Sequence, residues 1–98
     1  MESVAQPGLD ALIVKTPGVN GGRPHLRGHR IPVHRIARWW QLGLGIHEIL
    51  EEHSTLGPAE VHAALAYYHL HRGEIDGYLA DEAGAIEAAA ADKSRSAA

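Results

Sequence analysis

The chain contains no cysteine, no phenylalanine and only one methionine among its 98 residues. The absence of cysteine excludes disulfide bonds, thiolate metal sites and a cysteine nucleophile. The shortage of large side chains leaves Leu, Ile, Val, Trp and Tyr to build one modest core, as in a single small domain. Because such a core is limited, we expect the chain to gain stability as a homodimer.

The sequence also has no recognisable segment for export or for membrane insertion. The opening residues, MESVAQPGLDAL, have neither a basic start nor a long apolar stretch, and so do not resemble a signal peptide. No apolar run approaches the roughly 18–20 residues that a membrane-spanning helix needs. We therefore expect a cytoplasmic protein that does not contact a membrane.

Charge is distributed unevenly along the chain, although the net charge is only −3. Six basic residues and no acid occur between Lys15 and His47, whereas ten acids and three basic residues follow from Glu48 onward. Such asymmetry indicates two surfaces with different partners. The alternative is that the two halves attract each other within the fold.

The spacing of apolar residues predicts a mainly α fold, in which a short N-terminal β-hairpin precedes a three-helix, helix-turn-helix-like bundle. Residues 12–14 read as a strand, and residues 25–27 and 31–33 as short extended pieces on either side of a turn at Gly28. Apolar residues then recur at helical spacing and predict helices over 33–42 and 46–53, with a third beginning at Pro58. A fourth short helix around 75–79 is left open, because Gly73 and Gly77 weaken the pattern.

Three ranges follow from this pattern. Residues 1–11 are expected to form a flexible N-terminal arm, and residues 12–80 the folded domain. Residues 81–98, an Ala-rich stretch with little to bury, are expected to be a flexible tail that is frayed or disordered until it orders on a partner.

Two tandem blocks in the basic segment are distinctive: Gly22-Arg23-Pro24, and Gly28-His29-Arg30 followed by Ile31-Pro32-Val33. Together with AALAYY at 63–68, they resemble the bacterial domain-of-unknown-function family numbered 433, over about residues 13–79. That family is similar to helix-turn-helix, homeodomain-like domains, and its members often resemble VapB-type antitoxins encoded beside a PIN-like ribonuclease toxin. The resemblance implies an antitoxin that binds such a toxin and represses its own operon by binding operator DNA. Lys93 and Arg95 are then the residues expected to block the nuclease site.

The basic segment supplies the candidates for nucleic-acid binding, because arginine neutralises phosphates and reads guanine edges. These candidates are Arg23, Arg27, Arg35 and Arg38. Alternate residues of a strand face opposite sides, so some of these arginines would instead pin the hairpin to the acidic helices. A structural role in the hairpin is assigned to Gly22, Pro24, Gly28, Arg30 and Pro32.

Aromatic residues supply the candidates for a partner or dimer interface. Trp39 and Trp40 diverge by about 100° on a helix, and Trp40 fits the apolar stripe, which leaves Trp39 to one side. Trp39, Tyr67 and Tyr78 are therefore expected at an interface, since an exposed aromatic side chain is costly unless covered. The alternative for Trp39 is a position at the edge of the core.

Catalysis and metal binding receive little support from the sequence. The eight histidines do not show ligand spacing, and there is no HExxH, P-loop or dinucleotide motif. We expect no enzyme activity, no metal and no cofactor. The leading hypothesis is an antitoxin-like DNA-binding protein that neutralises a PIN-like toxin. The alternative is a protein-interaction or assembly module that does not bind DNA.

Overall fold

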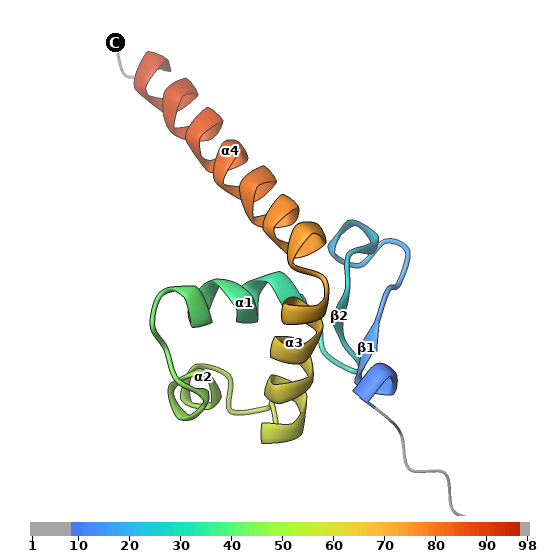
Figure 1. The fold of residues 1–98 in the computed structure, drawn as a ribbon. Helices are drawn as coiled ribbons and strands as arrows, with labels where there is room; N and C mark the ends of the chain where they lie inside the picture. Colours follow the sequence, from blue (N-terminus) through green and yellow to red (C-terminus); the bar gives the residue numbers. More distant parts are fainter. Residues whose placement is uncertain (1–8, 97–98) are drawn as a thin grey trace, which may run out of the picture.

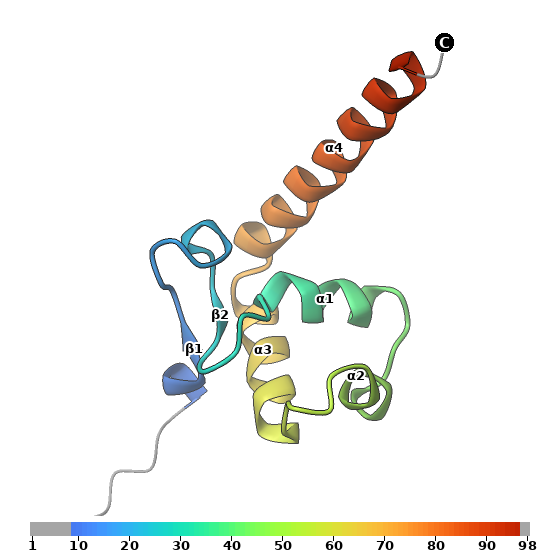
Figure 2. The same ribbon diagram turned by 180° about the vertical axis from the view of Figure 1, so that it is seen from behind.

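The elements up to residue 70 form the body, and one long helix, Arg72–Ser96, projects from it. The computed structural model describes residues 9–96, and the side chains of residues 11–92. The molecule measures 70 × 29 × 24 Å, and helix α4 rises away from the body past α1 (Figures 1 and 2). In chain order the elements are the 3-10 helix η1 (Leu9–Leu12), β1 (Ile13–Val14), the 3-10 helix η2 (Asn20–Gly22), β2 (His25–Leu26), α1 (Val33–Gln41), α2 (Ile46–Glu52), α3 (Pro58–Leu70) and α4 (Arg72–Ser96).

The mainly helical expectation is confirmed, and the described residues form four α-helices, where the sequence predicted three and left a fourth open. Residues 75–79 and most of the expected tail belong to one helix of 25 residues, with Gly73 and Gly77 inside it. The first turns of α4 are held by Ile75, which is fully buried. Once these turns form, the helix can propagate through an alanine-rich stretch of high helix propensity. Residues 1–8 of the expected N-terminal arm lie outside the described residues, and residues 9–11 belong to η1.

The N-terminal sheet differs in its pairing from the predicted hairpin. Strand β1 pairs antiparallel with β2, in the register Ile13 with Leu26 and Val14 with His25. The predicted pairing of 25–27 with 31–33 is reduced to a single bridge between His25 and Pro32. The ladder stops there because Pro32 has no amide hydrogen to donate and α1 begins at the next residue.

The core lies between α1, α2, α3 and the first turns of α4, with β2 closing one side. Its largest fully buried apolar members are Leu26, Val33, Ile36, Ile49, Val61, Tyr68 and Ile75. Val33, Ile36 and Ala37 lie on one face of α1, as their helical spacing requires, and α1 packs mainly on α3. Helix α4 packs along the side of α1 that carries His34 and Arg38, and Arg35 is exposed on the side away from the core.

Helices α2 and α3 begin with the same hydrogen bond, from a glycine N–H to a glutamate side chain three residues later. The Glu48 side chain accepts a hydrogen bond from the backbone N–H of Gly45 at 2.8 Å, and Glu60 accepts one from Gly57 at 2.7 Å. Each glutamate, three residues after its glycine, places negative charge at the helix N-terminus. This explains why α2 begins at Ile46 and α3 at Pro58.

Replacing Ile75 with alanine should lower the free energy of unfolding by about 2–5 kcal/mol, because it leaves a cavity where α4 meets the core. Urea denaturation followed by far-UV circular dichroism measures this loss. Glu52→Ala, at an exposed position of α2, is the control and should change stability by no more than about 0.5 kcal/mol. An equally small loss for Ile75→Ala would show that α4 is not anchored through this side chain.

Candidate functional site

The basic surface consists of four exposed arginine side chains from two consecutive segments of the N-terminal half of the body. Arg27 and Arg30 lie in the turn between β2 and α1. Arg35 and Arg38 lie on the side of α1 away from the buried face, where Arg38 borders a pocket lined by residues of α4. Arg35 and Arg38 are about 60° apart around the helix axis, so they share that face. Within the described part of the chain, none of these four side chains takes part in an ion pair or hydrogen bond.

Arg23, also a candidate for nucleic-acid binding, has internal partners instead. Its Nη2 lies 3.5 Å from Oδ2 of Asp81, and its guanidinium lies 4.6 Å from the centre of the Tyr78 ring. Both partners belong to α4. Arg23 therefore ties the segment before β2 to the long helix, which is the pinning role that the sequence left open for some of the arginines.

Arg30, which was assigned a structural role, contributes through its backbone. Its carbonyl oxygen accepts a hydrogen bond of 2.8 Å from Nδ2 of Asn20, while its side chain is exposed. The Gly28–Pro32 block is therefore structural, as predicted, but the arginine side chain with a structural contact is Arg23 and not Arg30.

The other residues of that block do hold the hairpin in place. Gly22 and Gly28 have φ angles of 79° and 78°, a left-handed conformation that glycine adopts readily. Pro24 and Pro32 are buried, and the Pro24 carbonyl accepts the N–H of Val33 at 2.9 Å. The turn thus delivers the chain to α1 in a defined direction.

A cluster around Glu74 joins β1, α3 and α4. The Tyr67 hydroxyl donates to Oε1 of Glu74 at 2.7 Å, and the Tyr78 hydroxyl donates to Oε2 at 2.8 Å. Lys15, just after β1, places its Nζ 3.1 Å from Oε2. Tyr67 and Tyr78, expected at an interface with a partner, therefore have their hydroxyls engaged inside the protein.

This cluster shifts the pKa values of its members in opposite directions. Burial raises the pKa of Glu74, but the hydrogen bonds from Tyr67, Tyr78 and Lys15 outweigh it, so the pKa lies below its ordinary value. Burial and the bond to Glu74 raise the pKa of Tyr67 above its ordinary value, and the same bond, followed by burial, raises the pKa of Tyr78. The cluster is thus stable with Glu74 ionised and both tyrosines neutral.

Three histidines also act as structural links. Nδ1 of the buried His25 lies 2.7 Å from the carbonyl of His29; since a carbonyl can only accept, Nδ1 carries the proton and Nε2 accepts from the Thr16 hydroxyl at 2.9 Å. Nε2 of His29 lies 3.0 Å from Glu60, and Nε2 of His34 lies 3.1 Å from Glu82. Among the described residues, no group of three or more His, Asp or Glu side chains is arranged to hold a metal ion.

Trp39 was expected to be exposed and Trp40 to be covered, and the structure shows the reverse. Trp39 is half-buried against the core and stacks on His53, with ring centres 4.8 Å apart, as in the alternative left open for it. Trp40 has 42% of its surface exposed. Trp40 does lie on the apolar stripe of α1, but it is in the last turn of the helix, beyond the buried residues of the core.

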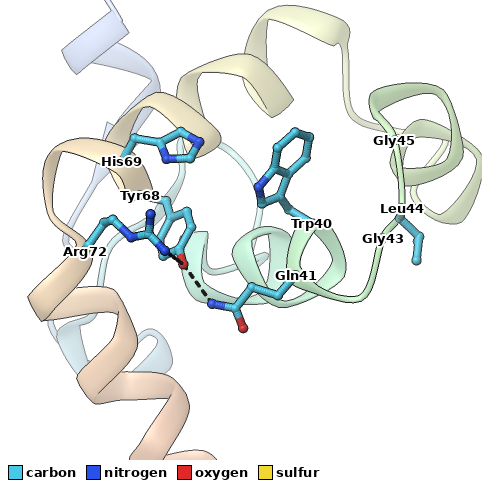
Figure 3. A pocket seen from close by; sticks show the side chains of 8 residues that line it. All are labelled: Trp40, Gln41, Gly43, Leu44, Gly45, Tyr68, His69 and Arg72. Carbon is cyan, nitrogen blue, oxygen red and sulfur yellow. Dashed lines mark hydrogen bonds between the residues drawn. The ribbon is translucent and has the colours of Figure 1, made fainter.

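Trp40 forms one wall of an open pocket of about 470 Å³. The pocket lies between the end of α1, residues 43–45, and the junction of α3 with α4 (Figure 3). His69 meets Trp40 edge to face at 6.3 Å, and Arg72 holds its guanidinium over the Tyr68 ring at 5.1 Å. The sequence pattern does not reveal this pocket. Its residues come from segments that are distant in the chain, and the only signal for it was the adjacent tryptophan pair.

These features define a small, mainly helical domain with a two-stranded sheet, an exposed basic surface and a projecting helix. The chain belongs to DUF433, a family of proteins of unknown function, whose model matches residues 13–68. Its fold is similar to the crystal structure of a DUF433 member from Anabaena variabilis ATCC 29413, with a TM-score of 0.68 and 35% sequence identity. The similarity covers 74% of this chain and 71% of that one. No curated protein matches the chain.

The family model matches up to residue 68, within α3, and so does not cover α4. No helix in the described part of the chain is long and apolar enough to cross a membrane.

Replacing Glu74 with glutamine should lower the free energy of unfolding at neutral pH by about 1–3 kcal/mol, because the charged group that accepts the partly buried hydrogen bonds of Tyr67 and Tyr78 is lost. Since folding lowers the pKa of Glu74, its contribution is present above the ordinary value of 4.5 and is lost as the pH falls through the folded value. The wild type and the variant should therefore converge in acid. Urea denaturation at a series of pH values, with Glu52→Gln as the control, measures this.

The two tyrosines have the opposite dependence. Because folding raises their pKa values, their contribution is present below the ordinary value of 10.0 and is lost as the pH rises through the folded value.

A stability difference between wild type and Glu74→Gln that stayed constant into acid would contradict the assignment of Glu74 as the ionised centre of the cluster.

Proposed function

We propose that the protein is an antitoxin-like DNA-binding protein of a toxin–antitoxin module, which represses its own operon and neutralises a PIN-like ribonuclease. The observation that carries the proposal is the division of the molecule into two unlike parts. One part is a body with four unpaired, exposed arginines, and the other is an acidic helix that extends beyond the body.

The DNA-binding part of the proposal rests on the arginines at positions 27, 30, 35 and 38. Each is exposed, and none is neutralised by a carboxylate in the described part of the protein. Arginines on one helix face and its preceding turn suit phosphates spaced along a DNA backbone. Arg23 does not belong to this surface, because Asp81 and Tyr78 already engage it.

A helix-turn-helix arrangement is proposed for α2 and α3, which residues 53–57 connect. Helix α3 would then occupy the position of a recognition helix. Its exposed side chains include Ala59, His62 and His69, which bring little charge. Most of the phosphate contacts are therefore assigned to the turn and to α1, with α3 contributing shape and hydrogen bonds.

The toxin-binding part of the proposal rests on α4. From Ala83 to Asp92 every residue of this helix is exposed. This part of α4 buries none of its described side chains, although most helical stability in proteins comes from packing. A partner that covers α4 would supply that packing. The side chains of Lys93 and Arg95, expected to enter the nuclease site, lie outside the described residues.

The alternative function, an assembly module that does not bind DNA, is favoured by one observation. The acidic half of the chain already neutralises part of the basic half, through Arg23 with Asp81 and Lys15 with Glu74. Measurement of DNA binding separates the two functions.

The triple variant Arg27→Gln, Arg35→Gln, Arg38→Gln should bind DNA from upstream of its own gene more weakly, since each arginine removed gives up a phosphate contact. Fluorescence anisotropy over a range of salt concentrations measures this. The slope of log K against log salt should fall by about 1 for each arginine that contacts a phosphate.

Arg23→Gln is the matched control for this experiment, because it removes the same charge from the same segment. It should reduce thermal stability while leaving the salt slope close to that of the wild type. If the wild type does not bind DNA at low salt, the regulatory part of the proposal is wrong and the assembly module is the better description.

The toxin-binding part predicts a PIN-like reading frame beside this gene. Co-expression with that neighbour should relieve the growth arrest that the neighbour causes alone, and a chain ending after Ala80 should lose this protection. The truncated chain keeps Ile75 and the Glu74 cluster, so circular dichroism can confirm that its body remains folded. Full protection by the truncated chain would remove α4 from the toxin contact.

A further inference from the structure

The large apolar side chains that remain exposed are concentrated around one pocket. Among the described residues there are four of them, with exposed fractions of 42% for Trp40, 58% for Leu42, 79% for Leu70 and 66% for Ile86. Trp40 lines the open pocket at the end of α1, and Leu42 and Leu70 are direct chain neighbours of its lining residues. Ile86 lies elsewhere, on α4, where it lines a second pocket together with Arg38 of α1 and stays largely exposed.

The pocket also holds a positive charge without a paired carboxylate. Nη2 of Arg72 donates to the Tyr68 hydroxyl at 3.2 Å, and Nε2 of Gln41 donates to the same oxygen at 2.8 Å (Figure 3). The Tyr68 hydroxyl in turn donates to Oδ1 of Asp76 at 3.3 Å. Within the described part, no carboxylate lies within ion-pair distance of Arg72. The pocket therefore suits an apolar group that carries an acid beside it.

Helix α4 presents a group of this kind. Leu79, Ala83, Ile86 and Ala90 follow one another at intervals of four, three and four residues, which places them on one stripe of the helix. Ile86 is the only large side chain on the exposed part of this stripe. Glu87 follows it directly, is exposed, and lies about 100° around the helix from Ile86.

We infer that the pocket at Trp40 receives Ile86 of a second copy of this chain, and that Glu87 of that copy pairs with Arg72. Each copy carries one pocket and one projecting helix, so a two-fold dimer makes the contact twice. A second copy is favoured over an unrelated partner because the same chain carries both halves of the contact, an exposed apolar side chain beside an acid and an open pocket with a guanidinium. Tryptophan and arginine are also the residues that most often dominate the energy of interfaces.

This dimer supplies the homodimer of the proposed function but depends on neither DNA nor toxin binding. Asp81 and Asp92 lie on the opposite side of α4 from the stripe and are not needed for the contact between copies. Failure of the dimer would therefore leave the test of DNA binding intact. The chain ending after Ala80 also lacks Ile86, so toxin protection by Ile86→Asp, which keeps the rest of α4, separates loss of the dimer from loss of the toxin contact.

Sedimentation analysis of the full chain tests the inference. The wild type should be a dimer, and Trp40→Ala and Ile86→Asp should each weaken dimerisation by about tenfold or more, as expected when a central interface residue is removed. Ala88→Asp is the matched control, since it introduces the same charge on the face of α4 opposite Ile86, and it should remain dimeric. Circular dichroism establishes that each variant is folded.

Mixing the two weakened variants provides a sharper test. Trp40→Ala keeps an intact helix and Ile86→Asp keeps an intact pocket, so the mixture should form heterodimers that contain one complete contact. The charge reversal Arg72→Glu should weaken the dimer, and combining it with Glu87→Arg in the same chain should restore it.

Three results would overturn the inference. The first is a wild type that is monomeric at every concentration studied. The second is an Ile86→Asp variant that is monomeric beside a Trp40→Ala variant that remains fully dimeric, because this would indicate pairing of two α4 helices. The third is a mixture of the two variants that dimerises no better than either alone.

Discussion

The carboxylate of Glu74 is the point at which the N-terminal segment, the bundle and the long helix are held together. It accepts hydrogen bonds from Tyr67 on α3 and Tyr78 on α4, and it pairs with Lys15 after β1. Three elements thus converge on one charged group on the first turn of α4. Arg23 adds a second link further along α4, through Tyr78 about one turn and Asp81 about two turns after Glu74. The direction in which α4 leaves the body depends on these contacts.

This arrangement separates the arginines into two groups with different physical roles. Arg23 is held by an aromatic ring and a carboxylate, so its charge is used within the fold. Arg27, Arg30, Arg35 and Arg38 have no such partners in the described part of the protein, so their charge is available to another molecule. The acidic residues of the C-terminal half therefore neutralise only part of the basic segment. A basic surface on a protein of net charge −3 is the consequence.

The same separation applies to the aromatic residues. Tyr67 and Tyr78 are engaged by Glu74, and Trp39 is covered by His53, whereas Trp40 stands at an open pocket. The molecule thus carries two features that a monomer leaves uncovered, the pocket and the exposed part of α4. Apolar surface of this kind commonly marks an interface. Both the proposed toxin contact and the proposed dimer use α4.

Local sequence alone determined the positions of the first three helices. Predicted ranges of 33–42 and 46–53 compare with observed helices at Val33–Gln41 and Ile46–Glu52, and α3 begins at Pro58 as expected. Apolar periodicity and helix-start residues act over a few neighbouring positions, so they can be read directly from the chain. The same holds for the Gly22–Pro32 block, where glycine and proline restrict the backbone locally.

Only the tertiary structure decided which arginine is structural, which tryptophan is exposed and whether α4 is continuous. Arg23 meets Asp81 across 58 positions of sequence, and the core closes before it reaches Trp40 because of where α3 and α4 lie. Ile75 anchors α4 despite two glycines that weaken its local pattern. Each of these outcomes depends on contacts between segments far apart in the chain, and no spacing rule over neighbouring residues contains that information.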